Sequence, residues 1–175
     1  MKQKSLLISL AGGILALLSI FLPWAKFDIS SILYEDRTTE VITHSGFETD
    51  RFLATLTFVV ALAILGISIY TLNQKTPWKS RKILLSSSGA GLLCVLLTLA
   101  LFTQSMNSFI EKMSDIAFDE STNDFGRAMD FSFKEAFENA ISLQFGGFGA
   151  AIGFIVAFIG AWSLPKSNLS MENRE

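Results

Sequence analysis

The sequence predicts an all-α membrane protein: a bundle of four transmembrane helices with a small extracytoplasmic β-hairpin and a helical cap. Half of its 175 residues are hydrophobic and only 17% are charged, which is too little polar surface to cover the core of a soluble domain. Four stretches contain no Asp, Glu, Lys or Arg, and each is long enough to cross about 30 Å of hydrocarbon. The charges between these stretches are sorted by sign.

The four charge-free stretches are the predicted spans of a single membrane domain, residues 1–175. They are residues 5–24, 52–73, 83–105 and 141–164. Every proline lies at or beyond the end of a span, where a missing N–H does least harm. A buried helix of a soluble protein rarely runs this far without a charge, so we expect four crossings.

The first span begins like a secretory signal peptide, because Lys2 and Lys4 make its start basic. Its apolar run is longer than that of a typical signal peptide. It also ends in the bulky pair Pro23 and Trp24 instead of the small residues of a cleavage site. These differences favour an uncleaved span.

The distribution of charge predicts the orientation. The N-terminus is basic, and the loop 74–82 holds four basic residues and no acid; the tail 165–175 adds Lys166 and Arg174. The loop 25–51 has three basic and six acidic residues, and the loop 106–140 has three and eight. The positive-inside rule then places both termini and the loop 74–82 in the cytoplasm, as expected for a plasma (inner) membrane protein. The aromatic residues near span ends, expected to form interfacial belts, are Trp24, Tyr70, Trp78 and Trp162.

The first outer loop, 25–51, has the pattern of a two-stranded hairpin over residues 26–44. Two β-prone runs flank a polar break at residues 35–38. An isolated hairpin is marginally stable, so it must pack on something, and the second outer loop is the expected partner. Ser45 and Gly46 then mark a turn back toward the membrane.

The second outer loop, 106–140, is too long to be structureless in a compact protein. Apolar residues at helical spacing after Met106 predict that the third span continues beyond the membrane as an amphipathic helix. A polar break at 119–124 follows, and Ser132 and Glu135 have the spacing of a capping box. We therefore expect two helical arms, the second leading through Ile141 into the fourth span, which together with the hairpin cap the outer face.

Small residues predict where the helices touch, because helices in a bilayer associate through close packing and interhelical hydrogen bonds. The predicted helix-packing residues are Gly12, Gly13, Gly89, Gly91, Gly149, Gly153 and Ala157. Packing within the chain is favoured over a homo-oligomer face, since GxxxG-type steps are common.

Apolar residues in the second outer loop form a candidate partner surface. They are Phe118, Phe125, Met129, Phe133 and Phe137. Exposed apolar patches mark interaction sites; the alternative is that these side chains pack within the cap or lie on the lipid interface.

The sequence contains no arrangement of residues that is typical of a catalytic, metal or cofactor site. No ionisable residue lies in a span, which argues against a proton-coupled carrier acting alone. Cys94 is the single cysteine and His44 the single histidine, so no disulfide, paired-thiol or zinc site is expected. We predict no catalytic residue, metal, cofactor or nucleic-acid partner; the expected partners are membrane lipids, a membrane protein or a second copy.

These observations favour a non-enzymatic accessory or scaffolding subunit that makes protein–protein contacts. The alternative is a component of a transporter or channel. That alternative predicts a polar groove between spans, lined by Ser86, Ser87, Ser88, Thr55, Thr57 and Thr98.

The first third of the chain resembles a known layout. A first span with paired glycines ends in Phe21-Leu22-Pro23-Trp24, and a β-prone loop then closes with Ser45-Gly46. This resembles small four-span membrane proteins of bacteria and is loosely similar to the claudin-like architecture, whose first outer loop forms a small sheet. The claudin signature of a Trp followed by two cysteines is not met, because that loop has no cysteine. The resemblance implies a fold and no binding residue.

Overall fold

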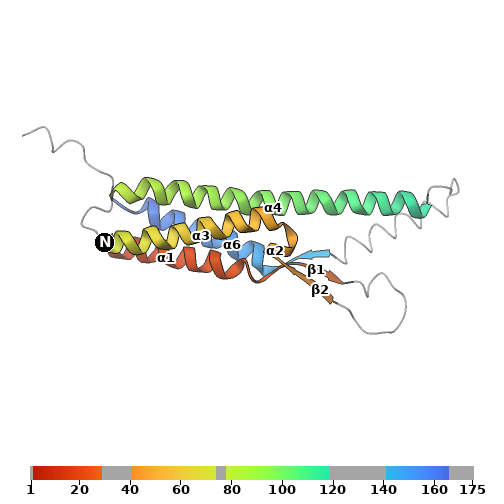
Figure 1. Ribbon diagram of the computed structural model, residues 1–175, viewed down its shortest axis with the longest axis horizontal. Helices are drawn as coiled ribbons and strands as arrows, with labels where there is room; N and C mark the ends of the chain where they lie inside the picture. Colours follow the sequence, from red (N-terminus) through yellow and green to blue (C-terminus); the bar gives the residue numbers. More distant parts are fainter. Residues whose placement is uncertain (1, 29–40, 74–77, 119–140, 166–175) are drawn as a thin grey trace, which may run out of the picture.

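The computed structural model describes residues 2–28, 41–73, 78–118 and 141–165 of the chain (Figure 1). The long helices are α1 (Lys2–Ser19), α3 (Arg51–Leu72), α4 (Trp78–Phe118) and α6 (Phe145–Trp162). The shorter elements are the helix α2 (Gly46–Thr49) and the strands β1 (Pro23–Asp28), β2 (Val41–Ser45) and β3 (Ile141–Leu143). The described part of the chain is thus mostly helical with a small antiparallel sheet, as the sequence predicts.

Three helices are long and apolar enough to cross a membrane: α3, the Ser80–Ser108 part of α4, and α6. Of the most apolar stretch of each helix, only 28%, 33% and 44%, respectively, is buried inside the protein. Most of this apolar surface therefore faces outward, as expected of helices in contact with lipid. The predicted spans 52–73, 83–105 and 141–164 thus correspond to helices that are long and apolar enough to cross a membrane.

The helix α1 is shorter than the predicted span 5–24, and its apolar part is Gln3–Ser19. Its last turn tightens: Phe21 N–H donates to the Leu18 carbonyl at 3.2 Å and Leu22 N–H to the Ser19 carbonyl at 3.3 Å. Bonds of this i to i−3 type close helix ends. The prediction is wrong over the last five residues of the range, where the chain turns and Pro23 begins β1.

The fourth predicted span, 141–164, is also wrong at its first residues. Ile141–Leu143 forms β3 instead of a helical turn, and α6 begins at Phe145. The backbone here bonds to β1, since Gln144 N–H donates to the Trp24 carbonyl at 2.9 Å. The expected helical entry through Ile141 is therefore not formed. The capping box at Ser132 lies outside the described residues.

The sheet has the strand order β2-β1-β3. The strands β1 and β2 are antiparallel, with Lys26 opposite Thr43, which agrees with the predicted hairpin. The strand β3 adds to the other edge of β1, with Ala25 opposite Leu143, so the predicted two strands are corrected to three. The third strand supplies the packing that an isolated hairpin lacks. The predicted turn at 35–38 lies outside the described residues.

The helix α4 has 41 residues, which gives it a length of roughly 60 Å at 1.5 Å per residue. Figure 1 shows it continuing well past the outer ends of α3 and α6. The predicted extension of the third span beyond residue 105 is therefore confirmed as far as Phe118. The polar break at 119–124 lies outside the described residues.

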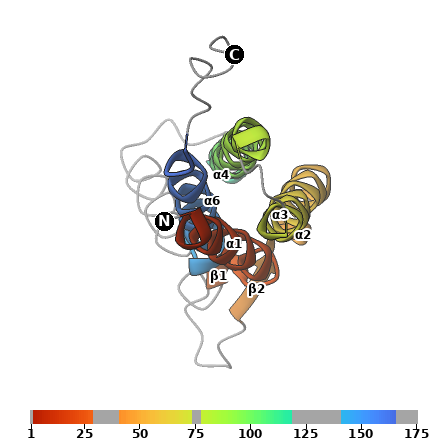
Figure 2. The same cartoon turned by 90° about the vertical axis from the view of Figure 1, so that its left-hand side faces the viewer.

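The long helices pack side by side, α1 against α3 and α6, and α4 against α3 and α6 (Figure 2). The core between them contains Ile64, Leu84, Val95 and Phe154, each fully buried. At the outer end, Asp50 caps α3: one carboxylate oxygen accepts from the N–H groups of Phe52 and Leu53, both at 3.0 Å. Such a cap contributes about 1 kcal/mol and sets where α3 begins.

Candidate functional site

The contact between α1 and α6 is a seam where the two backbones touch. A Cβ added to Gly12 would lie 2.5 Å from the Gly153 carbonyl oxygen, and a Cβ added to Gly153 would lie 2.5 Å from the Ala16 amide nitrogen. Real Cβ atoms essentially never come that close. Glycine at both positions is therefore required for this approach, as in other small-residue helix pairs. The predicted packing residues Gly12, Gly153 and Ala157 all lie here.

Two serines of α1 extend this seam toward the N-terminal end of α1. The Ser9 hydroxyl donates to the Ala157 carbonyl at 3.0 Å, and the Ser5 hydroxyl donates to the Ser163 carbonyl at 3.4 Å. A Cβ on Gly160 would meet the Ser5 carbonyl at 2.8 Å. Sequence reasoning did not select these serines. The signal was present, because small residues recur on α1 at three- and four-residue steps: Ser5, Ser9, Gly12, Ala16 and Ser19.

The remaining predicted glycines lie in different places. Gly149 abuts the Ser19 hydroxyl of the α1–α6 seam, and Gly13 faces Leu65 of α3. A Cβ on Gly91 would meet the Phe154 ring, but one on Gly89 would have nothing within 4 Å. Residues two apart on a helix point in nearly opposite directions, about 200° apart. Gly89 therefore lies on the open face of α4 and does not make the predicted helix contact.

Trp24 joins the membrane part of the protein to the sheet. It is 1% exposed, and its indole N–H donates to the Ser19 carbonyl at 2.9 Å. A Cβ on Gly146 would lie 2.6 Å from the Pro23 carbonyl, and one on Gly46 would lie 3.0 Å from the Trp24 ring. Trp24 is thus a core residue, and its expected place in an interfacial belt is corrected. Tyr70 and Trp162 are 62% and 60% exposed at helix ends, as a belt requires.

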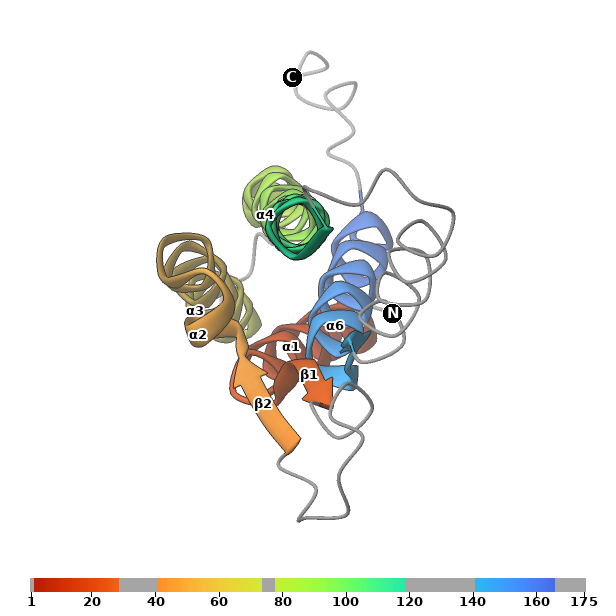
Figure 3. The same ribbon diagram turned by 90° about the vertical axis from the view of Figure 1, so that its right-hand side faces the viewer.

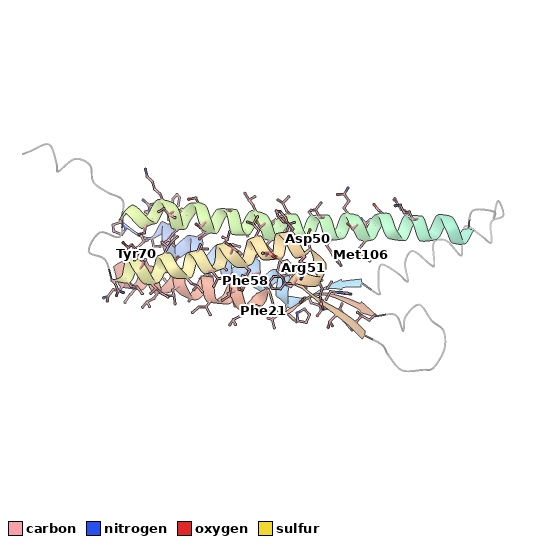
Figure 4. The ribbon with its side chains drawn as sticks, viewed as in Figure 1. Phe21, Asp50, Arg51, Phe58, Tyr70 and Met106 are labelled. Atoms are coloured by element: carbon pink, nitrogen blue, oxygen red, sulfur yellow. The ribbon has the colours of Figure 1, made fainter. Side chains whose placement is uncertain are left out.

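Phe21 lies near Trp24, just after the end of α1. Its ring centroid lies 5.7 Å from that of Phe47 and 6.0 Å from that of Phe58. Figure 4 shows Phe21 and Phe58 facing one another from α1's end and α3. Aromatic pairs at these distances stabilise the contact between the elements that carry them. These ring contacts pack α2 against the neighbouring ends of α1 and α3.

Sequence reasoning also missed a capping box at the start of α2. The Glu48 carboxylate accepts from the Ser45 N–H at 2.7 Å and from the Ser45 hydroxyl at 3.1 Å. The S-x-x-E spacing was visible in the sequence. The bond from the Ser45 N–H, followed by the one from its hydroxyl, lowers the pKa of Glu48 below the ordinary value of 4.5.

The lowered pKa of Glu48 predicts a pH dependence of stability. A carboxyl group with a depressed folded-state pKa stabilises the fold above its unfolded value, near 4.5, and this contribution is lost as the pH falls through the folded value. We therefore expect wild type to be more stable than Glu48→Gln at neutral pH, with the difference disappearing below pH 4.5. Unfolding in detergent measured at several pH values tests this. A difference that stays constant into acid would contradict it.

The hydroxyls of the proposed polar groove bond to their own helices. Five of them donate to the carbonyl four residues earlier, at 2.6–2.9 Å: Thr55, Thr57, Ser86, Ser88 and Thr98. Hydroxyls bonded in this way satisfy themselves locally and need no partner from another helix. This arrangement supports packing in preference to a polar pathway between spans.

The residue types that commonly bind metals, His, Cys, Asp and Glu, do not cluster in the part of the chain that the structure describes. Among the described residues, no group of three or more His, Cys, Asp and Glu could hold a metal ion. Cys94 is buried within α4. His44 lies in β2 opposite Ala25. The two residues that sequence reasoning examined for redox and zinc chemistry are therefore on separate elements.

The part of α4 that extends past the other helices carries a row of exposed side chains between residues 103 and 112. Its side chains at 103–105, 107, 108, 111 and 112 are exposed, and Met106 is half-buried. Figure 3 looks onto this end and shows the strands beside α1 and α6, with α4 on the opposite side. Of the candidate partner surface, the backbone of Phe118 lies at the end of α4. Phe125, Met129, Phe133 and Phe137 lie outside the described residues.

No family model matches the chain, and no curated protein or solved structure matches it. The resemblance to claudin-like and bacterial four-span proteins therefore stays a prediction.

Proposed function

We propose that α1 is a fourth membrane span. Its 18 residues measure about 27 Å at 1.5 Å per residue, close to the thickness of the hydrocarbon core. It pairs with α6 from Ser5 near one end to Ser19 at the other. Its outward side chains are apolar, with Leu7 54% and Leu18 59% exposed. A helix that follows a spanning helix in this way shares its environment.

The proposed orientation places both termini and the loop 74–82 in the cytoplasm of a cell bounded by the plasma (inner) membrane. One end of the helices carries Lys4, Arg81 and Lys82 with no acidic residue among those described there, and the other carries Glu48 and Asp50 beside Arg51. This separation of charge supports the positive-inside orientation. A reporter that works only in the cytoplasm should be active when it is fused after residue 175. A reporter that works only outside the cytoplasm should be inactive at the same position.

We further propose that the chain is a non-enzymatic accessory or scaffolding subunit of a membrane assembly. The observation that carries this proposal is the exposed outer part of α4. A helix gains most of its stability from packing, so a protein that covered the exposed side chains of this extension would stabilise it. Five hydroxyls of the predicted polar groove bond to their own helices, which favours packing over a polar pathway between the spans.

Affinity purification of the full chain from native membranes in mild detergent tests the accessory role. The test variant is the double substitution Gln104→Arg and Glu111→Arg, at two exposed positions of α4. The matched control is Leu93→Ala, which changes a lipid-facing residue of the same helix that is 62% exposed. We expect a stoichiometric companion with wild type and the control that is lost with the double variant. A chain that is monomeric and without a companion would refute the proposal.

A further inference from the structure

The cytoplasmic ends of α4 and α6 hold a guanidinium group against an indole ring. The Arg81 Cζ atom lies 5.8 Å from the centroid of the Trp162 ring, which is within the range of a cation–π contact. Trp162 in turn stacks on Phe158, with 6.1 Å between ring centroids and 25° between ring planes. The contact fixes the position of a cation at the end of the membrane span.

The charge of Arg81 lacks a balancing anion in the described part of the chain. Its Nε atom is buried and has no hydrogen-bond partner among the described residues. The neighbouring stretches 2–7, 68–85 and 158–165 contain no Asp or Glu. A partly desolvated guanidinium is costly unless an acceptor reaches it. An anion from outside these stretches would supply an acceptor for this guanidinium.

The surface beside Arg81 indicates what kind of molecule carries that anion. Along α6, away from Arg81 and into the membrane, Trp162, Ile159 and Ile155 are 60%, 53% and 44% exposed. Free phosphate would contact only the cation. A phospholipid would place its phosphate on the guanidinium and its acyl chains along this apolar face.

We propose that Arg81 and Trp162 bind the phosphate of an anionic phospholipid whose acyl chains lie along α6. The guanidinium donates to the phosphate oxygens, as arginine does at other phosphate sites. The indole ring holds the guanidinium in place and lies at headgroup level, where tryptophan is favoured. That the lipid comes from the cytoplasmic leaflet rests on the proposed orientation. The binding site itself does not depend on that orientation.

Native mass spectrometry of the full chain in mild detergent, titrated with phosphatidylglycerol, tests this site. The variant is Arg81→Gln. The matched control is Lys82→Gln, which removes the same charge from the next residue, an exposed side chain. We expect about tenfold weaker lipid binding for Arg81→Gln, the size of one lost charge-assisted hydrogen bond. Lys82→Gln should weaken binding by less than about twofold, as an exposed charge does. Trp162→Leu should weaken it by roughly threefold through loss of the cation–π contact.

Further arms of the experiment separate the sources of the anion. Phosphatidylcholine should bind more weakly than phosphatidylglycerol, and inorganic phosphate should not displace the bound lipid. Displacement by phosphate, or equal losses in Arg81→Gln and Lys82→Gln, would overturn the proposal. The tail carboxylates Glu172 and Glu175 are outside the described residues, and E172Q/E175Q should leave lipid binding unchanged. A gain of lipid binding in that variant would show that the tail neutralises Arg81. Lipid binding is measured in detergent and does not depend on how the chain is oriented in a membrane. A failed orientation test would therefore not contradict this site.

Discussion

Gly12→Ala and Gly153→Ala should each destabilise the protein strongly, because one added methyl group would enter the backbone of the facing helix. At Gly12 the new Cβ would lie 2.5 Å from the Gly153 carbonyl oxygen and 2.9 Å from the Ala157 Cα. Backbone atoms cannot move aside as a flexible side chain does, so α1 and α6 must separate. Overpacking of this kind costs about 1–3 kcal/mol. Separation would also lengthen the 3.0 Å bond from the Ser9 hydroxyl to the Ala157 carbonyl.

Gly66→Ala and Gly89→Ala are the matched controls for this prediction. The same methyl group meets nothing within 4 Å at either position. Since alanine favours a helix over glycine by up to about 1 kcal/mol, these variants should be neutral or slightly stabilised. Unfolding of all four variants in mixed detergent micelles gives the comparison. If Gly12→Ala and Gly153→Ala proved as stable as the controls, the two backbones would not be in contact.

Trp24→Ala should be the most destabilising single truncation at the outer end of the protein. The side chain is 1% exposed and among the largest that are fully buried. Removing a buried tryptophan costs about 3–5 kcal/mol. The Ser19 carbonyl would also lose the indole N–H that donates to it at 2.9 Å. The sheet should loosen as well, because Trp24 lies in β1 and the backbone bond from Gln144 N–H to its carbonyl would lose the packed indole ring beside it.

The control for Trp24→Ala is Phe145→Ala, which removes an aromatic side chain that is 84% exposed at the same end of the protein. We expect a change within about 0.5 kcal/mol for this surface position. Trp24→Phe should lie between the two, because it keeps most of the buried ring and loses the hydrogen bond. Thermal unfolding in detergent and hydrogen exchange of β1 would measure both effects. Equal stability of Trp24→Ala and Phe145→Ala would contradict the assigned role.

The sequence was sufficient to predict where the apolar helices lie but not where they end. Residues 52–73 were predicted as a span and α3 is Arg51–Leu72. At residues 141–143 the prediction failed, because Ile-Ser-Leu before α6 is as free of charge as the helix itself. The conformation of these residues depends on bonds to β1, more than a hundred residues earlier. No local pattern contains that pairing.

The contacts at the candidate functional surfaces could likewise be predicted only in part from the sequence. Gly12 and Gly153 were recognised as packing residues, but Gly89 was grouped with them although it faces open space. Ser5 and Ser9 share the stripe of small residues that contains Gly12, but the sequence does not show whether their hydroxyls bond within α1 or across to α6. The contact between Arg81 and Trp162 joins residues 81 positions apart. Their basic and aromatic character was apparent, and their proximity was not.

The sequence by itself determined that the chain forms helices long and apolar enough to cross a membrane, since length, hydropathy and the exclusion of charge are properties of each segment alone. It also predicted the hairpin of β1 and β2 and the extension of α4, whose patterns are local. Only the tertiary structure decided which helix faces meet and which lie on lipid. The physical reason is that lipid tails are as apolar as leucine, so hydropathy does not distinguish a buried face from a lipid-facing one. Close steric fit decides between them, as at Gly12 and Gly153, where backbone lies against backbone.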